Sequence, residues 1–288
     1  MMINADIVTN RMLLRDNIYI KHKKITKQTN LHPHSHNGYE IYLFLSGKAT
    51  YIIGDCIYQL EPGDMLTFNG DQLHYVKPNF SIPYVRTVVN FTNDYITSFL
   101  SGTVFQKIES LFIRQGGNLI HWNNEEKVEL EKILALIAQE DDDRSDGYEE
   151  MMRSYFSILL MKILRKNYSE YSKPRDFYTN QRELHVERVL GFINQRYRET
   201  VSLDDIASEI HLNKYYLCHS FKSVTGLTIN QYFIKRRIDE GKKLLEETDR
   251  PISIIAEDIG FGGIAQFSRL FKQHVGVSPK TFRRGFIG

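Results

Sequence analysis

Cysteine is scarce in this 288-residue chain, which has only Cys56 and Cys218, far apart in the sequence. Two distant cysteines cannot form the disulfide framework of a small secreted domain, so we interpret both as reduced thiols of a cytoplasmic protein. A run of about 18 apolar residues, which a membrane-spanning helix needs, is also missing. The first ten residues, MMINADIVTN, lack the basic segment and the apolar core of a signal peptide, so we expect neither secretion nor membrane insertion.

A large excess of one charge is also missing, because the net charge is +2, with 42% hydrophobic and 25% charged residues. These values are ordinary for a soluble globular protein, and the length is enough for two domains. The charge is nevertheless unevenly distributed. From Arg182 onward there are 17 Lys and Arg against 13 Asp and Glu, whereas the residues before it have 20 against 22. This basic excess indicates an anionic partner for the C-terminal part, although a solvated surface would give the same pattern.

Short β-strands are predicted for the residues up to about position 95. The segment YEIYLFLSGKATYIIGDCIYQLEPGDMLTF, which begins at Tyr39, alternates strand-forming runs with turn signals. The turn signals are Ser46-Gly47, Gly54-Asp55 and Pro62-Gly63-Asp64. Short strands at this spacing predict an antiparallel barrel or sandwich.

Two helices are predicted after the strands, over residues 124–140 and 148–166. Apolar residues recur at helical spacing in both, and Asn123 or Asn124 is a plausible N-cap of the first. The second helix has a broad stripe of methionine, leucine and phenylalanine, which suits either packing on the strands or a contact between two copies of the chain. A polar segment with Pro174 then breaks the pattern and predicts a linker. We therefore divide the chain into a barrel (1–95), a helical region (96–166), a linker (167–181) and a helical C-terminal domain (182–288).

The C-terminal domain contains an internal repeat. FKSVTG, which begins at Phe221, recurs as FKQHVG at Phe271, and further matches surround both segments. A repeat of this length indicates one supersecondary unit used twice. Each copy has a short amphipathic helix, a turn and a second helix, which predicts two helix-turn-helix units. Ser202 and Ser253 are expected to cap the first helix of each unit, and Gly226 is expected to end the second helix of the first unit.

The outward faces of the two second helices carry candidate binding residues. They are Tyr215, His219 and Lys222 in the first unit, and Ala265, Arg269 and Lys272 in the second. Arg can bind guanine with two hydrogen bonds and Lys can neutralise phosphate, so such faces suit the major groove of DNA. One face of this kind is more often an ordinary solvated surface, but two faces in matched register favour DNA binding.

The segment from Ser202 to Arg284 resembles the DNA-binding domain of AraC/XylS-type transcription regulators, most specifically in ISIIAEDIGFGGIAQFSRLFKQHVGVSPKTFR. The resemblance implies that two helix-turn-helix units, joined by a long central helix, enter adjacent major grooves on one face of the DNA. TINQYFIKRRIDEGKKLLEET would be the central helix, with Gly241 where the family usually has alanine. The DNA-binding residues implied by the resemblance and the helix faces are Tyr215, Cys218, His219, Lys222, Ile264, Ala265, Gln266, Arg269 and Lys272.

A second resemblance lies in the N-terminal part, where HPHSHNGYEIYLFLSG is followed by PGD and a later histidine. This pattern resembles the two motifs of the cupin fold over roughly residues 20–92. The resemblance implies a site inside the barrel made of His34, His36, Glu40 and His74. In metal-binding members such residues hold a divalent Fe, Mn, Zn or Ni ion, for which imidazole and carboxylate are suitable ligands. We rank a small polar effector, for example a sugar, above a metal as the occupant. Hydrogen bonding among these residues is a third alternative, and His32 is a further candidate.

Together these features predict an α+β protein of two domains, a cupin-like antiparallel barrel followed by helices and an all-α double helix-turn-helix domain. The expected function is sequence-specific regulation of transcription, without catalysis, under the control of a small effector in the barrel. The expected partners are promoter DNA, the effector, RNA polymerase and a second copy of the chain. Two alternatives stay open: a metal-dependent cupin enzyme with a helical appendage, and a regulator whose barrel only mediates dimerisation.

Overall fold

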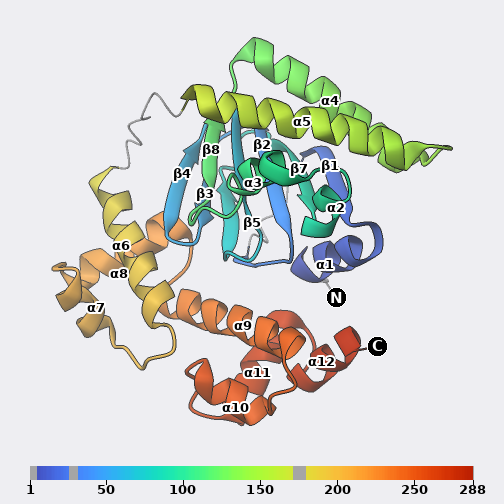
Figure 1. Ribbon diagram of the computed structural model, residues 1–288. Helices are drawn as coiled ribbons and strands as arrows, with labels where there is room; N and C mark the ends of the chain where they lie inside the picture. The colour runs from blue at the N-terminus through green and yellow to red at the C-terminus, as the bar shows by residue number, and fades with distance from the viewer. Residues whose placement is uncertain (1–4, 26–31, 171–179, 288) are drawn as a thin grey trace.

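The computed structural model describes residues 5–25, 32–170 and 180–287, and Figure 1 shows their arrangement. A β-barrel lies at the centre, a pair of long helices lies across its upper side, and a helical C-terminal domain lies below and to one side. No helix within these residues has the length and apolarity that a membrane crossing requires. The strands are β1 (Ile18–Ile25), β2 (Tyr39–Ser46), β3 (Ala49–Ile53), β4 (Cys56–Leu60), β5 (Asp64–Asn69), β6 (His74–Pro78), β7 (Val85–Phe91) and β8 (Asn118–His121). The helices of this part are α1 (Ala5–Asp16), α2 (Asn93–Thr97), α3 (Gly102–Glu109), α4 (Asn124–Asp143) and α5 (Tyr148–Glu170).

Two antiparallel sheets make up the barrel. The first has five strands in the order β1-β7-β2-β5-β8, and the second has three strands in the order β4-β3-β6. The predicted turns fall between β2, β3, β4 and β5, where Gly47, Gly54 and Gly63 have positive φ angles. Glycine is required at position 63, because a Cβ atom there would lie 2.3 Å from the carbonyl oxygen of Trp122. The antiparallel barrel that the turn spacing predicts is therefore confirmed.

Part of the region expected to be helical belongs to the barrel. Asn118–His121 forms β8 at the edge of the five-stranded sheet, where it pairs with β5. This strand has only four residues, too few for an alternating pattern to be recognised in the sequence. The helix α1, ahead of the first strand, is likewise absent from the sequence-based expectation. Residues 171–179, most of the expected linker, lie outside the described residues.

The helices α4 and α5 lie side by side across the barrel (Figure 1). Asn123, one of the two predicted N-caps, caps α4. In α5, Met152 and Phe156 are buried in the same apolar cluster as Phe91 of β7. The ring centroids of Phe156 and Phe91 are 4.8 Å apart. The methionine-rich stripe therefore packs on the barrel, which is one of the two alternatives that the sequence leaves open.

The C-terminal domain is helical throughout its described residues. Ser202 caps the first helix of the first unit by accepting a hydrogen bond from the backbone N–H of Asp205, as predicted. In the second unit the prediction is wrong, because the helix begins at Ile252 with Pro251 as N-cap, and Ser253 lies inside it. The fixed φ angle of proline allows the helix to begin earlier. The helices are α6 (Gln181–Arg196), α7 (Leu203–Glu209), α8 (Lys214–Thr225), α9 (Ile229–Glu247), α10 (Ile252–Asp258), α11 (Ile264–Val275) and α12 (Pro279–Ile287).

Two helix-turn-helix units, α7–α8 and α10–α11, are joined by α9, as the repeat predicts. The second helix of each unit ends at a glycine in the left-handed conformation, Gly226 with φ 78° and Gly276 with φ 92°. Gly241 lies where α9 crosses the second unit, since a Cβ atom there would lie 3.0 Å from side-chain atoms of Ile259 and Phe267. This close approach explains the glycine, although it costs about 1 kcal/mol of helix stability relative to alanine.

The barrel and the first helix-turn-helix unit share one apolar core. Ile52 of β3, Ile57 of β4 and Tyr75 of β6 are buried in the same cluster as Leu190 of α6 and Phe221 of α8. The second unit has a separate core, which it forms with the C-terminal half of α9. The barrel therefore fixes the position of the first unit directly, and α9 connects the second unit to it.

Replacing Phe156 by alanine should destabilise the protein by about 3–5 kcal/mol, because the lost ring leaves a cavity between α5 and the barrel. Val104, which is 39% exposed on α3, provides a matched control. Its substitution by alanine should change the free energy of unfolding by less than about 0.5 kcal/mol. Urea denaturation followed by circular dichroism would measure both. Equal losses in the two variants would mean that this face of α5 does not contact the barrel.

Candidate functional site

The outward face of α8 carries the first set of candidate DNA-binding residues. Asn213 caps this helix by accepting hydrogen bonds from its first backbone N–H groups. Tyr215 is 81% exposed, and His219 and Lys222 are exposed further along the same face. Phe221, on the opposite face, is buried in the core shared with the barrel. The core contacts therefore hold the polar face of α8 toward solvent.

A groove beside α8 contains residues to which the sequence does not point. Its volume is about 450 Å³, and part of its wall is the outward face of α8 itself. The additional residues come from the start of α7 and of α9, and they meet only when these helices pack against α8. The lining residues are Leu203, Tyr215, Cys218, His219, Lys222, Thr228, Ile229 and Asn230.

The corresponding face of α11 carries the second set. Arg269 and Lys272 are exposed, and Ile264 is 47% exposed at the start of the helix. Gln266 is also exposed, but its side-chain oxygen accepts a hydrogen bond from the backbone N–H of Gly262 and so stabilises the turn before α11. The structure therefore places the predicted faces of both units on the surface of the whole chain.

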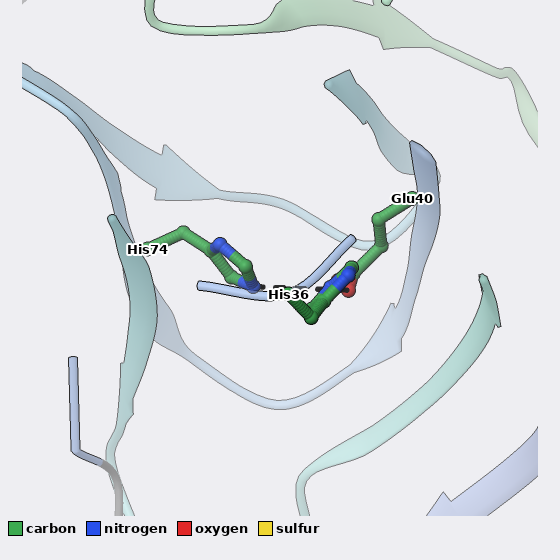
Figure 2. Close-up of side chains that lie close together, drawn as sticks. All are labelled: His36, Glu40 and His74. Atoms are coloured by element: carbon green, nitrogen blue, oxygen red, sulfur yellow. Dashed lines mark hydrogen bonds and ion pairs between the residues drawn. The ribbon is translucent and has the colours of Figure 1, made fainter. Parts of the chain in front are cut away.

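A cluster of three side chains lies inside the barrel, and Figure 2 shows His36, Glu40 and His74 converging there. Glu40 comes from β2, His74 is the first residue of β6, and His36 lies on the segment just before β2. Their potential ligand atoms lie within 4.8 Å of one another, and all three residues are buried. Gly70 lets the His36 ring approach, because a Cβ atom at position 70 would lie 2.4 Å from it.

The converging group contains three of the four residues that the cupin resemblance implies. His34 lies beside them, since its backbone pairs with that of His74 and the two ring centroids are 4.4 Å apart. The fourth residue therefore borders the group rather than belonging to it. His32 is exposed, and it contributes a backbone carbonyl that accepts a hydrogen bond from Nδ1 of His34 at 3.0 Å.

Backbone carbonyl groups determine the tautomers of the two converging histidines. Nδ1 of His36 donates to the carbonyl of Asn37 at 2.9 Å, and Nδ1 of His74 donates to the carbonyl of Gln72 at 2.8 Å. A carbonyl oxygen can only accept, so the proton of each neutral ring is on Nδ1 and Nε2 carries a lone pair. Hydrogen bonds of this kind orient the histidine ligands of metal ions in proteins.

The cluster lacks positive charge at its centre. Nε2 of His36 lies 3.0 Å from Oε2 of Glu40, and Nε2 of His74 lies 3.8 Å from the same oxygen. When both rings are neutral, each contact places a nitrogen lone pair against a carboxylate oxygen, with no proton between them. Nε2 of His74 has no hydrogen-bond partner among the described residues. A proton or a metal ion between the three groups would make these contacts attractive.

The carboxylate of Glu40 stays ionised although it is buried. Burial alone would raise the pKa of Glu40, but its contacts with His36 and His74 and the hydrogen bond from the amide of Asn90 outweigh burial and hold the pKa at about 2. Burial, followed by the electrostatic effect of the neighbouring His34, lowers the pKa of His74 well below its ordinary value. A carboxylate beside neutral imidazole nitrogens is a ligand set that fits divalent Fe, Mn, Zn or Ni.

Two further residues, Asn90 and Tyr51, complete the surroundings of Glu40. They donate hydrogen bonds to its two carboxylate oxygens at 2.8 and 3.1 Å. Neither residue belongs to the set that the cupin resemblance implies, and the one signal for Asn90 is a polar residue in an apolar strand. Their role depends on pairing between strands that a single sequence does not reveal.

The space around the cluster is closely packed. The ring of Phe68 is 4.8 Å from that of His74, and the ring of Tyr51 stacks parallel to His74 at 6.5 Å. His74 therefore lies among aromatic side chains of the barrel interior. A cavity of about 170 Å³ lies elsewhere, between α1 and the α4–α5 pair. The groove beside α8 is formed by residues far from the cluster in the sequence.

Two parts of the sequence match known protein families. Residues 22–150 match a family described as the AraC-like ligand binding domain, and residues 206–285 match a helix-turn-helix domain. The first match contains the three converging residues of the barrel, and the second contains both candidate faces. Together the matched segments make up most of the chain.

Individual relatives are operon regulators. The melibiose operon regulatory protein of Escherichia coli strain K12 is 33% identical over 127 residues, which are 44% of this chain and 40% of that protein. The chain thus matches about two fifths of the length of this relative. The Msm operon regulatory protein of Streptococcus mutans is 23% identical over 252 residues, 88% of this chain and 86% of that protein.

Among solved structures, ToxT from Vibrio cholerae is 18% identical, with 94% of this chain and 97% of that chain covered. The TM-score is 0.39, which is too low to support a structural argument. The family assignment therefore rests on the sequence matches. Because an AraC-like ligand binding domain precedes a helix-turn-helix domain, and a relative aligned over most of both chains is an operon regulatory protein, this chain belongs to the AraC family.

Proposed function

We propose that this protein is a DNA-binding transcription regulator whose barrel carries the regulatory site. The observation that carries the proposal is the pair of matching outward faces on α8 and α11, both exposed in the whole chain. The similarity to regulatory proteins of the melibiose and Msm operons supports the same role. RNA polymerase, a second copy of the chain and a cytoplasmic location belong to this proposal.

Each unit would place its second helix in a major groove, with the outward face against the bases. On α11, Arg269 would donate two hydrogen bonds to a guanine, and Lys272 would neutralise a phosphate. Ala265 suits apolar contact with the methyl group of a thymine. On α8, Tyr215 and His219 occupy the base-facing positions. α9 sets the separation of the two units. Adjacent major grooves on one face of the DNA require a separation of about 34 Å.

The proposed contact between two copies of the chain would use the outer side of α4 and α5. Apolar residues remain exposed there although the inner sides of both helices pack on the barrel. Val128 and Leu136 of α4 are 52% and 39% exposed, and Met151 and Ile158 of α5 are 41% and 47% exposed.

Arg269→Ala and Lys272→Ala should weaken DNA binding in different ways. Loss of Arg269 should cost about 1–3 kcal/mol of binding free energy on the preferred sequence and relax the preference at one base pair. Loss of Lys272 should weaken binding to all sequences and reduce the slope of log affinity against log salt by about one unit.

Fluorescence anisotropy with a duplex selected from a random library, and with a scrambled duplex, would separate these effects. Arg269→Lys keeps the charge and should restore general affinity but not the base preference. If Arg269→Ala weakens the selected and the scrambled duplex equally, Arg269 contacts only the backbone of the DNA, and base reading by this residue is excluded.

For the barrel we propose a divalent transition-metal ion as the occupant of the cluster, held by His36, Glu40 and His74. The proposal is supported by the unpartnered Nε2 of His74 and by the close packing around it. When bound, such an ion would supply the positive charge that the ionised Glu40 and the two lone pairs lack. A small polar effector is the second candidate, which the relatives that regulate sugar operons favour. We propose a sensory rather than a catalytic role for either occupant.

The chain purified without added ions should contain about one equivalent of a divalent metal. Chelators should remove the ion, and so should low pH, because protons compete for the imidazole nitrogens. His36→Ala and His74→Ala should abolish metal binding. Asn90→Ala should weaken it by about 10- to 100-fold, because Asn90 orients a ligand without contacting the ion.

His121→Ala is a matched control for these measurements. His121 lies in the same barrel, where its Nδ1 atom is 2.7 Å from Asp64, and it does not belong to the cluster. Plasma emission spectrometry and calorimetric titration would give the metal content and affinity of each variant. If the wild-type chain binds no metal but binds a polar small molecule in a manner that His36→Ala abolishes, the effector alternative is correct.

A further inference from the structure

The segment that carries His36 also contacts the DNA-binding domain. Ser35, the residue just before His36, donates a hydrogen bond from its hydroxyl group to Oδ1 of Asp239 at 2.6 Å. Ser35 and Asp239 are 5% and 3% exposed, so this bond is shielded from water. Asp239 lies on α9, the helix that joins the two helix-turn-helix units.

Asp239 is a charged acceptor whose partners are few. Nζ of Lys242 lies 3.2 Å from Oδ1, and Oδ2 has no hydrogen-bond partner among the described residues. Burial would raise the pKa of Asp239, but the charges of Lys242 and Lys243 and the hydrogen bond from Ser35 outweigh it and keep the pKa below its usual value. A hydrogen bond to a buried, ionised carboxylate is among the stronger ones in proteins.

A second contact ties the same face of α9 to the surroundings of His36. Lys243, one turn after Asp239, donates to the carbonyl of Asp71. The neighbouring carbonyl, that of Gly70, accepts the backbone N–H of His36 at 2.9 Å. Both segments that position His36 are therefore bound to one turn of α9.

The barrel leaves the candidate DNA faces uncovered. Side chains of the barrel contact the end of α8, where Tyr75 donates to the carbonyl of Thr225 and Lys77 donates to that of Val224. Tyr215 and Arg269 stay exposed in the same structure. The barrel can thus influence DNA binding through the placement of the two units, but not by covering their faces.

Occupancy of the cluster requires a small movement of its side chains. The two measured distances from Glu40 to the imidazole nitrogens of His36 and His74 are 3.0 and 3.8 Å, and the three groups lie within 4.8 Å. Ligand bonds of about 2.0–2.2 Å bring neighbouring ligand atoms to about 3.0–3.5 Å from one another. The ligands must therefore draw together around an ion, and Ser35 is the residue just before one of them, His36.

From these contacts we infer that the Ser35–Asp239 hydrogen bond couples occupancy of the His36–Glu40–His74 cluster to the placement of α9, and thereby to DNA binding. The inference rests on the proposed function, of which it specifies the regulation. It requires reciprocity, because a ligand that changes the affinity for DNA must have its own affinity changed by DNA by the same factor.

The test uses the full chain, Zn²⁺ as the probe and the selected DNA duplex. DNA affinity is measured by anisotropy with Zn²⁺ or with a chelator, and Zn²⁺ affinity is measured by calorimetry with and without DNA. In the wild-type chain both experiments should give the same coupling factor, about fivefold or more in either direction. In Ser35→Ala and Asp239→Asn this factor should fall to about one, while each ligand still binds alone.

Two variants serve as controls. Ser35→Thr retains the hydroxyl group and should retain the coupling. Gln59→Ala removes another hydrogen bond between the domains, from Gln59 to Glu183 of α6 at 2.9 Å, which touches neither the His36 segment nor α9. It should leave the coupling factor unchanged.

The outcomes distinguish this inference from the proposals on which it rests. A wild-type chain that does not bind Zn²⁺ in the absence of DNA overturns the ion site and the coupling together. A chain that binds both ligands with a coupling factor of one, or with a factor that survives in Ser35→Ala, overturns the coupling alone. An equal loss of coupling in Gln59→Ala would mean that the whole interface, rather than this bond, transmits the signal.

Discussion

The negative charge of Glu40, buried inside the barrel, constrains the structure around it. An ionised carboxylate removed from water is tolerated only when hydrogen bonds or opposite charges replace its solvation. Here Asn90 stands directly opposite Glu40 in the pairing of β2 with β7, and Tyr51 reaches the same carboxylate from β3 in the other sheet. A slip of one residue between β2 and β7 would turn Asn90 out of the barrel, so the charge selects one register. The two imidazole rings, whose Nδ1 atoms are held by backbone carbonyls, direct their Nε2 atoms toward this carboxylate.

The second constraint is the core that the barrel shares with the first helix-turn-helix unit. The two matched families describe separate domains, but Tyr75 of the barrel and Phe221 of α8 belong to one buried cluster. Polar contacts surround it, including the hydrogen bond from the backbone of Ile57 to Glu187 of α6 at 2.9 Å. The first unit is therefore placed by the barrel, whereas the second unit, whose core contains Phe267 and Phe271, is placed by α9.

The sequence predicts those features whose signals are local. The turns of the barrel depend on glycines such as Gly63, and two helix ends depend on Ser202 and Gly226, all of which act on their immediate neighbours. The repeat is equally visible, because each copy must bury the same face. What the sequence does not predict comes from distant pairing: β8 is recognisable only beside β5.

The coupling contact illustrates the same limit at the level of single residues. His36 and Glu40 are implied by the cupin resemblance, but Ser35 looks like an ordinary polar residue between two histidines. Its partner, Asp239, is 204 positions away, and nothing in either segment marks the pair. A family resemblance can thus indicate the ligands of a buried site, whereas the contacts that connect the site to another domain require the tertiary structure.

The position of Asp239 along α9 determines which parts of the DNA-binding domain this contact can affect. Tyr232 and Phe233, in the N-terminal half of α9, are buried in the core shared with the barrel, whereas Ile238 and Leu245 are buried in the core of the second unit. Asp239 therefore lies where the helix passes from one core to the other. Because a helix transmits a displacement along its length through its own hydrogen bonds, a shift at this point moves the second unit relative to the first. In the coupling that we infer, an occupant of the barrel would in this way change the spacing of two candidate DNA-binding faces that it never touches.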